Sequence, residues 1–191
     1  MLMNMENQIL LAGINTAPYF ALSTMSICKP RKVAGNLCRH QGMTMLILKD
    51  YGFIDAILLK ASLVHDLIED IEGFNPQLII DCDDDGADVL SLVLEVTRRI
   101  GESKTDFLKR IYNEGSEKAC LLKAADRIAN LSECQFLMDI DFIKRLCDES
   151  EQYVIPIAKR VCKDMVTELT DLIHHARRLL PVMEILVNKG D

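Results

Sequence analysis

The chain has 191 residues, of which 49% are hydrophobic and 27% charged, and this composition is typical of one compact domain rather than a disordered or fibrous protein. Its 29 acidic and 22 basic residues give a net charge of -7, which argues against a nucleic-acid partner because proteins that coat nucleic acid carry clustered excess Lys and Arg. Only 5% of the residues are aromatic, and aliphatic residues are abundant, so the composition favours an all-α fold.

The N-terminal segment 1–28 is apolar, but no basic residues precede its apolar stretch, and Asn4, Glu6 and Pro18 interrupt it. We therefore predict a first core helix there rather than a signal peptide. The chain has no run of about 20 uninterrupted apolar residues, the length that a membrane-spanning helix requires. Its seven cysteines contain no C-x-x-C pair, which argues against a disulfide framework and a thiolate zinc site. These features predict a cytoplasmic protein with reduced cysteines and no membrane partner.

The longest helical pattern runs from about Asp50 to Ile71, where apolar side chains recur at three- and four-residue steps. Gly73, Asn75 and Pro76 follow it, so the pattern predicts one central, largely buried helix that ends before them. Further helices are predicted at 89–100, 105–112, 117–137, 142–163 and, as an additional C-terminal helix, 164–187. No period-two alternation is sustained and no linker is evident. We therefore expect a single domain, 1–191, built as a compact multi-helix bundle.

An acidic cluster lies between two of these helices. Asp81, Asp83, Asp85 and Gly86 reproduce the opening of an EF-hand calcium loop. That loop requires a bidentate Glu six residues after the glycine, and this chain has Leu92 there. The pattern therefore indicates an exposed acidic loop before a helix N-terminus rather than a calcium site.

Four ionisable residues, His65, Asp66, Glu69 and Asp70, interrupt the aliphatic helix predicted at 50–71. At 100° per residue all four share one wedge of a helix surface. His and Asp are ligands of transition metals, and Glu69 and Asp70 lie one turn farther on, close enough to handle protons or order a water. A solvated face of an amphipathic helix is the alternative, but the apolar residues on several sides count against it.

Two further segments carry candidate residues. Asp126 and Asn130 lie four positions apart, and so on one helix face, in a segment rich in Ala and Leu. On its own this spacing is equally typical of a surface pattern. His40 stands alone, and a lone His is more often structural than a metal ligand.

The order of these pieces resembles the HD-domain superfamily of metal-dependent phosphohydrolases, and more narrowly the hydrolase domain of RelA/SpoT-type enzymes, especially the small stand-alone alarmone hydrolases. The resemblance covers about residues 20–158 and is carried by Arg31-Lys32, His40, the HDxxED run at 65–70 and the later Asp126-Arg-x-x-Asn130. It implies an HD-domain fold and an enzyme of the stringent response. That enzyme would remove the 3′-diphosphate of guanosine 3′,5′-bis(diphosphate), ppGpp, with Mn²⁺ or another divalent cation.

Residue roles follow from the resemblance where positions match. It implies metal ligands at His40, His65, Asp66 and Asp126, a catalytic carboxylate pair at Glu69 and Asp70, guanine contacts at Arg31 and Lys32, and a nucleotide contact at Asn130. The resemblance is also compatible with a homo-oligomer.

The chain departs from the family pattern at several positions, none of which is an expected metal ligand. Gln41 stands where Pro is usual and Ile71 where Thr is usual. The phosphate-facing Lys of the family has no clear counterpart, so Arg98, Arg99 and Lys104 all remain candidates.

Two other functions remain open at this point. The chain could be an HD phosphohydrolase that acts on another nucleotide or phosphate ester, because metal ligands specify water activation while less distinctive residues select the base. It could also be a non-catalytic nucleotide-sensing HD module. A degraded site would have lost a ligand or the carboxylate pair, and this chain retains them all, so the enzyme is favoured.

Overall fold

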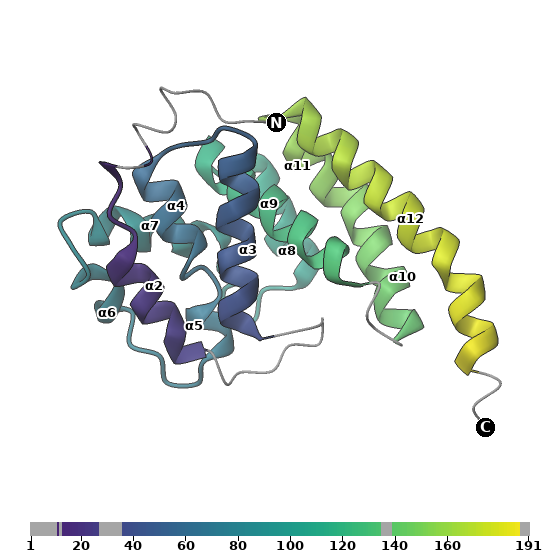
Figure 1. The fold of residues 1–191 in the computed structure, drawn as a ribbon, viewed down its shortest axis with the longest axis horizontal. Coiled ribbons are helices and arrows are strands. Elements are labelled where there is room, and N and C mark those ends of the chain that lie inside the picture. The colour runs from purple at the N-terminus through teal and green to yellow at the C-terminus, as the bar shows by residue number, and fades with distance from the viewer. Residues whose placement is uncertain (1–10, 12, 27–35, 135–138, 188–191) are drawn as a thin grey trace.

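The computed structural model describes residues 11, 13–26, 36–134 and 139–187. Within these ranges the chain contains helices and no β-strand, so the prediction of an all-α, multi-helix bundle is confirmed (Figure 1). Arg31 and Lys32, the expected guanine contacts, lie outside the described residues, as do residues 1–10, 12 and 27–28 of the segment in which a first helix was predicted.

The helices are named here in chain order with their bounds: α2 (Ala17–Ser23), α3 (Leu37–Asp50), α4 (Ala56–Ser62), α5 (Leu67–Asp70), α6 (Gln77–Ile80), α7 (Gly86–Val96), α8 (Lys104–Glu114), α9 (Glu117–Glu133), α10 (Ile140–Glu149), α11 (Ile155–Lys159) and α12 (Lys163–Val187). A 3₁₀ turn, η1 (Thr24–Ser26), follows α2, and a π-helical turn, η3 (Ser150–Val154), joins α10 to α11. Several helices begin at a polar side chain that accepts a backbone N–H of the first turn: Asn36, Asp55, Ser103, Ser116 and Asp139. Such caps satisfy amides that have no partner inside the helix, so the sequence itself specifies where these helices start.

The prediction of one continuous helix from Asp50 to Ile71 is wrong. Asp50 ends α3, and Gly52 adopts a positive φ of 82° in the connection to α4. The chain then leaves the helical path a second time after Ser62, and α5 begins only at Leu67. The imidazole Nδ1 of His65 lies 2.8 Å from the Ser62 carbonyl, so the ring takes an acceptor that the next helical amide would otherwise use. His65 and Asp66 therefore lie in a turn and not in the middle of a helix.

Other boundaries differ in similar ways. The segment predicted as one helix at 142–163 is divided into α10, η3 and α11. Pro181 lies inside α12, within the predicted C-terminal helix 164–187. None of the described helices is both long and apolar enough to cross a membrane.

Helix α9 occupies the centre of the bundle. It packs against α3, α4 and α7 toward the N-terminal half and against α11 and α12 toward the C-terminal half (Figure 1). The residues of α9 from Ala119 to Ala129 are all buried, including Lys123, Asp126 and Arg127. A charged residue is rarely buried without a partner, so this helix brings ionisable groups into the interior where they must be paired.

The acidic cluster is not simply an exposed loop, which corrects the expectation from the sequence. The buried Lys60 of α4 donates to Asp83 at 2.6 Å and to Asp85 at 2.5 Å, and the Tyr19 hydroxyl of α2 donates to Asp83 at 2.6 Å. Burial and the neighbouring Asp83 carboxylate raise the pKa of Tyr19, so the hydroxyl keeps its proton. Lys60 thus supplies the positive charge that the acidic loop faces, and it ties α2, α4 and the start of α7 together.

Replacing Lys60 with alanine is expected to destabilise the fold strongly. The variant leaves Asp83 and Asp85, whose side chains are 24% and 42% exposed, without their cation, and a loss of about 2 kcal/mol is expected, between that of a surface pair and that of a buried pair. Urea unfolding measures the loss. Lys49→Ala is the matched control, because Lys49 pairs with Asp50 at the surface at 3.7 Å and its loss should cost under about 1 kcal/mol. Equal losses in the two variants would contradict a structural role for Lys60.

Candidate active site

Two histidines and two aspartates from separate elements meet in the interior. His40 comes from α3, His65 and Asp66 from the turn between α4 and α5, and Asp126 from the middle of α9. Each offers one ligand atom, and these atoms all lie within 4.8 Å of one another. His40 and Asp126 are buried, with Nε2 of the histidine 3.0 Å from Oδ1 of the aspartate. The structure therefore brings together the residues that the resemblance implies as metal ligands, in a cluster that could hold a metal ion.

The orientation of His65 tests whether the cluster fits a cation. Its Nδ1 donates to the Ser62 carbonyl, which leaves the lone pair of the neutral ring on Nε2. Nε2 is buried and has no hydrogen-bond partner among the described residues. It lies 3.4 Å from an oxygen of Asp66 and 3.8 Å from one of Asp126. A nitrogen lone pair that faces two carboxylates is a suitable place for a cation. In metal-binding histidines the other ring N–H commonly donates to a carboxylate, a backbone carbonyl or a water, as Nδ1 of His65 does to the Ser62 carbonyl.

The electrostatics of the cluster point the same way. Burial disfavours the charged form of His65, but the carboxylates of Asp66 and Asp126 outweigh it and raise its pKa to about 9. Burial likewise opposes ionisation of Asp126, yet Lys123 and the two histidines hold the pKa of this carboxyl well below its usual range. The two carboxylates thus create a site that favours positive charge, carried either by a proton or by a metal ion.

Two neighbouring side chains donate hydrogen bonds to the Asp126 carboxylate. Lys123 Nζ donates to Oδ2 at 2.7 Å, and Asn130 Nδ2 donates to Oδ1 at 2.7 Å, the oxygen that also faces His40. Asn130 also lines the cavity described below, so its amide lies where a nucleotide could contact it. The structure therefore gives Asn130 a role in orienting Asp126 that the sequence did not indicate.

Glu69 and Asp70, the expected carboxylate pair, are both exposed on the short helix α5. Glu69 lines the same cavity as His65 and Asp66, and its Oε1 accepts a hydrogen bond from the backbone N–H of Arg98. Asp70 instead lines a neighbouring cavity, together with Arg98 and Arg99. Of the two carboxylates, Glu69 is thus the one that borders the histidine and aspartate cluster.

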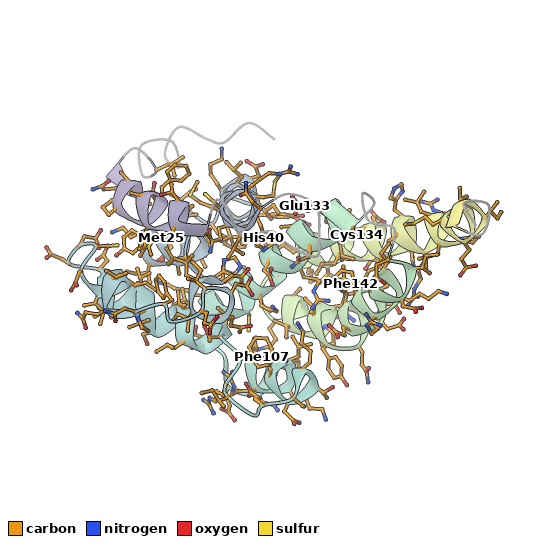
Figure 2. The ribbon with its side chains drawn as sticks, turned by 90° about the horizontal axis from the view of Figure 1, so that it is seen from below. Met25, His40, Phe107, Glu133, Cys134 and Phe142 are labelled. Atoms are coloured by element: carbon orange, nitrogen blue, oxygen red, sulfur yellow. The ribbon has the colours of Figure 1, made fainter. Side chains whose placement is uncertain are left out.

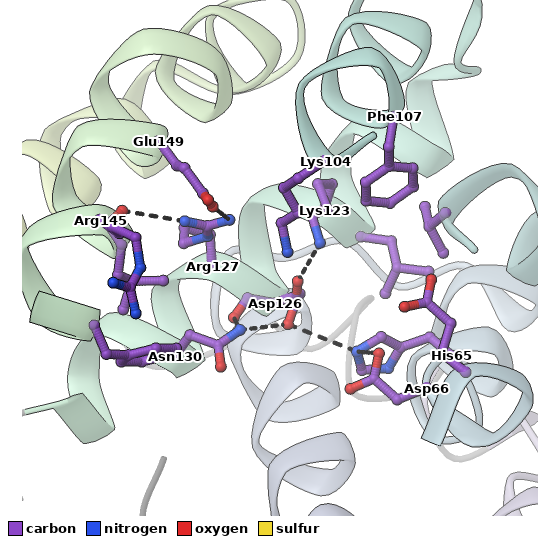
Figure 3. A pocket seen from close by; sticks show the side chains of 15 residues that line it. His65, Asp66, Lys104, Phe107, Lys123, Asp126, Arg127, Asn130, Arg145 and Glu149 are labelled. Carbon is purple, nitrogen blue, oxygen red and sulfur yellow. Dashed lines mark hydrogen bonds and ion pairs between the residues drawn. The ribbon is translucent and has the colours of Figure 1, made fainter. Parts of the chain in front are cut away.

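The cluster opens into a cavity of about 350 Å³. His65 and Asp66 lie at one end, and Arg127 of α9 and Arg145 of α10 lie at the opposite, cationic end (Figure 3). Lys104 of α8 and Lys123 of α9 lie between the two ends, and Lys123 donates to Asp126 of the cluster. Phe107 of α8 and Phe142 of α10, which also line the cavity, are labelled with His40 in Figure 2. One pocket thus combines a site for a cation with several groups that attract anions.

Lys104 is the candidate from the sequence that lines this cavity, whereas Arg98 and Arg99 line the neighbouring one. Desolvation and the nearby charges of Lys123 and Arg127 lower the pKa of Lys104. The sequence did not single out Lys123, Arg127, Arg145 or Glu149. Lys123 and Arg127 flank Asp126 and offered a signal, but nothing in the pattern around Arg145 and Glu149 distinguishes them from a solvated helix face.

Comparison with solved structures finds a protein described as a metazoan ortholog of SpoT that hydrolyzes ppGpp and plays a role in starvation responses. The two structures superpose with a TM-score of 0.65 at 20% sequence identity, over 92% of this chain and 97% of the other. This chain has the fold of a SpoT ortholog. The resemblance to SpoT-type hydrolases found in the sequence is thus confirmed at the level of the fold. No family model and no curated protein matches the sequence.

Proposed function

We propose that this chain is a metal-dependent pyrophosphohydrolase that removes the 3′-diphosphate of ppGpp or a close relative. The observation that carries the proposal is the cluster of His40, His65, Asp66 and Asp126, which lies beside a cavity with a cationic end. The fold shared with a SpoT ortholog that hydrolyzes ppGpp supports the same substrate class.

The four clustered side chains would hold the cation. Imidazole nitrogens with carboxylate oxygens suit Mn²⁺ and related divalent ions, and the uncompensated Nε2 of His65 fits such a ligand set. A divalent cation there would supply Lewis-acid chemistry, since it makes a water more acidic and neutralises negative charge on a phosphate. Lys123 and Asn130 keep the Asp126 carboxylate turned toward the histidines, so the protein fixes this ligand before a cation binds.

The carboxylates on α5 would handle the proton. Glu69 borders the cavity and is exposed to it, so its free oxygen can accept a proton from the attacking water and return it to the leaving group. Its other oxygen is engaged by the Arg98 amide, which fixes the orientation of the carboxylate. Asp70 is the second member of the proposed pair, and its position beside Glu69 would sustain the local negative charge.

The charge distribution of the cavity suits a nucleotide with two separate anionic groups. ppGpp carries one diphosphate at the 5′ position of its ribose and one at the 3′ position. One diphosphate would bind at the histidine and aspartate cluster, and the other would bind Lys104, Arg127 and Arg145, whose cationic groups form strong charge-assisted hydrogen bonds with phosphate. Arg31 and Lys32 remain the proposed contacts to the guanine base.

A metal analysis combined with a panel of nucleotides tests the proposal on purified protein. We expect a stoichiometric divalent metal, cleavage of ppGpp to GDP and pyrophosphate, and little cleavage of dNTPs or cyclic nucleotides. Removal of the metal by a chelator should abolish activity, and Mn²⁺ should restore it. Faster cleavage of another nucleotide would instead favour a different HD phosphohydrolase, and binding of ppGpp without any turnover would favour a sensor.

A further inference from the structure

The cationic end of the cavity contains one feature that a phosphate-binding site does not need, a carboxylate. Glu149 of α10 lines this end together with Arg127 and Arg145 (Figure 3). The other carboxylates that line the cavity have different partners. Asp66 and Asp126 belong to the histidine cluster, and Glu69 accepts from the Arg98 amide. Glu149 is therefore the cavity carboxylate that pairs with Arg127.

Arg127 does not depend on Glu149 for its position. Its side chain is only 2% exposed, and Nη1 donates to the Leu146 carbonyl at 3.1 Å and to the Ser150 hydroxyl at 3.0 Å. These two bonds anchor the guanidinium to the junction of α10 and η3. Removing the charge of Glu149 would consequently leave Arg127 in place.

The pair between Glu149 and Arg127 is loose. Oε2 of Glu149 lies 3.5 Å from Nη2 of Arg127, whereas Arg177 of α12 pairs with Asp148 of α10 at 2.9 Å and with Glu151 of η3 at 2.8 Å. The Glu149 side chain is 32% exposed and occupies the last residue of α10, where the helix changes to the π-helical turn. A carboxylate with so long a contact and such access to water can leave its partner at little cost.

We propose that Glu149 is a resident counter-ion of the cationic end, displaced from Arg127 when a phosphate group binds, and that it limits the affinity of the site for strongly anionic ligands. A phosphate can form shorter, charge-assisted bonds with the same cations, and it repels the carboxylate that it replaces. This inference rests on the proposed function, because it assigns one diphosphate of the substrate to the cationic end.

The variant Glu149→Gln tests the inference because it removes the charge and keeps the shape and the acceptor oxygen. We expect the KM for ppGpp to fall about fivefold while kcat changes by less than about twofold. This is the result of a change that stabilises the bound substrate and the transition state equally. The effect should shrink as salt is added. If Glu149 instead held the site in shape, the variant would show a raised KM or a lowered kcat, and either result would overturn the inference.

Asp148→Asn is the matched control. Asp148 is the neighbouring residue on α10, its side chain is 70% exposed, and it pairs with Arg177 outside the cavity. Its neutralisation removes the same charge from the same helix and should leave KM unchanged. An equal fall in KM in both variants would indicate a general effect of net charge and would contradict a specific role of Glu149.

Equilibrium binding of inorganic pyrophosphate to the metal-loaded protein separates this inference from the proposed function. If the wild type fails to cleave ppGpp but Glu149→Gln binds pyrophosphate more tightly than the wild type and Asp148→Asn do, the function is wrong and the counter-ion role is supported. If the wild type cleaves ppGpp but Glu149→Gln binds neither ppGpp nor pyrophosphate more tightly than the wild type does, the function is supported and the counter-ion role is wrong.

Discussion

Asp66→Ala is expected to abolish both metal binding and turnover. The Asp66 carboxylate lies 3.6 Å from Nε2 of His40 and 3.4 Å from Nε2 of His65, so its removal takes away one of the two negative charges that the cluster offers to a cation. Without the Lewis acid we expect ppGpp hydrolysis to fall by about a thousandfold or more.

Elemental analysis of the purified variant and an assay of pyrophosphate release measure the two losses. Asp50→Ala is the matched control, because Asp50 is exposed at the end of α3 and pairs only with the surface residue Lys49 among the described partners. Thermal unfolding followed by circular dichroism should show that both variants fold. Full turnover in the folded Asp66→Ala variant would place the chemistry elsewhere in the molecule.

The sequence predicted the all-α fold well because composition and apolar spacing report directly on helices. It placed His65 and Asp66 inside a helix, however, because the turn after Ser62 keeps the apolar pattern. Leu63, Val64 and Leu67 are all buried, so the periodicity continues across the break. A turn that is itself part of the core leaves no signal in a hydrophobic pattern.

The cationic end of the cavity was hidden for a different reason. Arg145 lies on α10, an amphipathic helix whose charged residues look like an ordinary solvated face in the sequence. Lys104 at the start of α8 was one of three candidates that the sequence could not separate. They meet Arg127 only because α8 and α10 approach the buried helix α9 in the folded chain. Lys60 is similar, since only the tertiary structure shows that its charge is directed at the acidic loop. The order of the motifs identified the four side chains that cluster in the structure, whereas residues outside a motif could be found only from the fold.

Glu69→Gln separates proton transfer from metal binding. Glu69 borders the cavity but is not one of the four clustered side chains, so the variant should retain its metal. Glutamine keeps an oxygen that can accept a hydrogen bond from the Arg98 amide, so the connection between α7 and α8 should stay in place. It cannot accept a proton at neutral pH, and loss of such a general base lowers turnover by about a hundredfold to ten-thousandfold.

The measurement is kcat for ppGpp together with the metal content of the same preparation. Glu72→Gln serves as the matched control, because Glu72 is an exposed carboxylate three positions farther along the chain and does not line the cavity. It should keep wild-type kcat and metal. Loss of metal from Glu69→Gln would indicate that Glu69 is a metal ligand. An unchanged kcat with full metal content would indicate that another group accepts the proton. A selective loss of kcat would instead show that the α5 carboxylate takes part in the chemistry, while the buried cluster only supplies the cation.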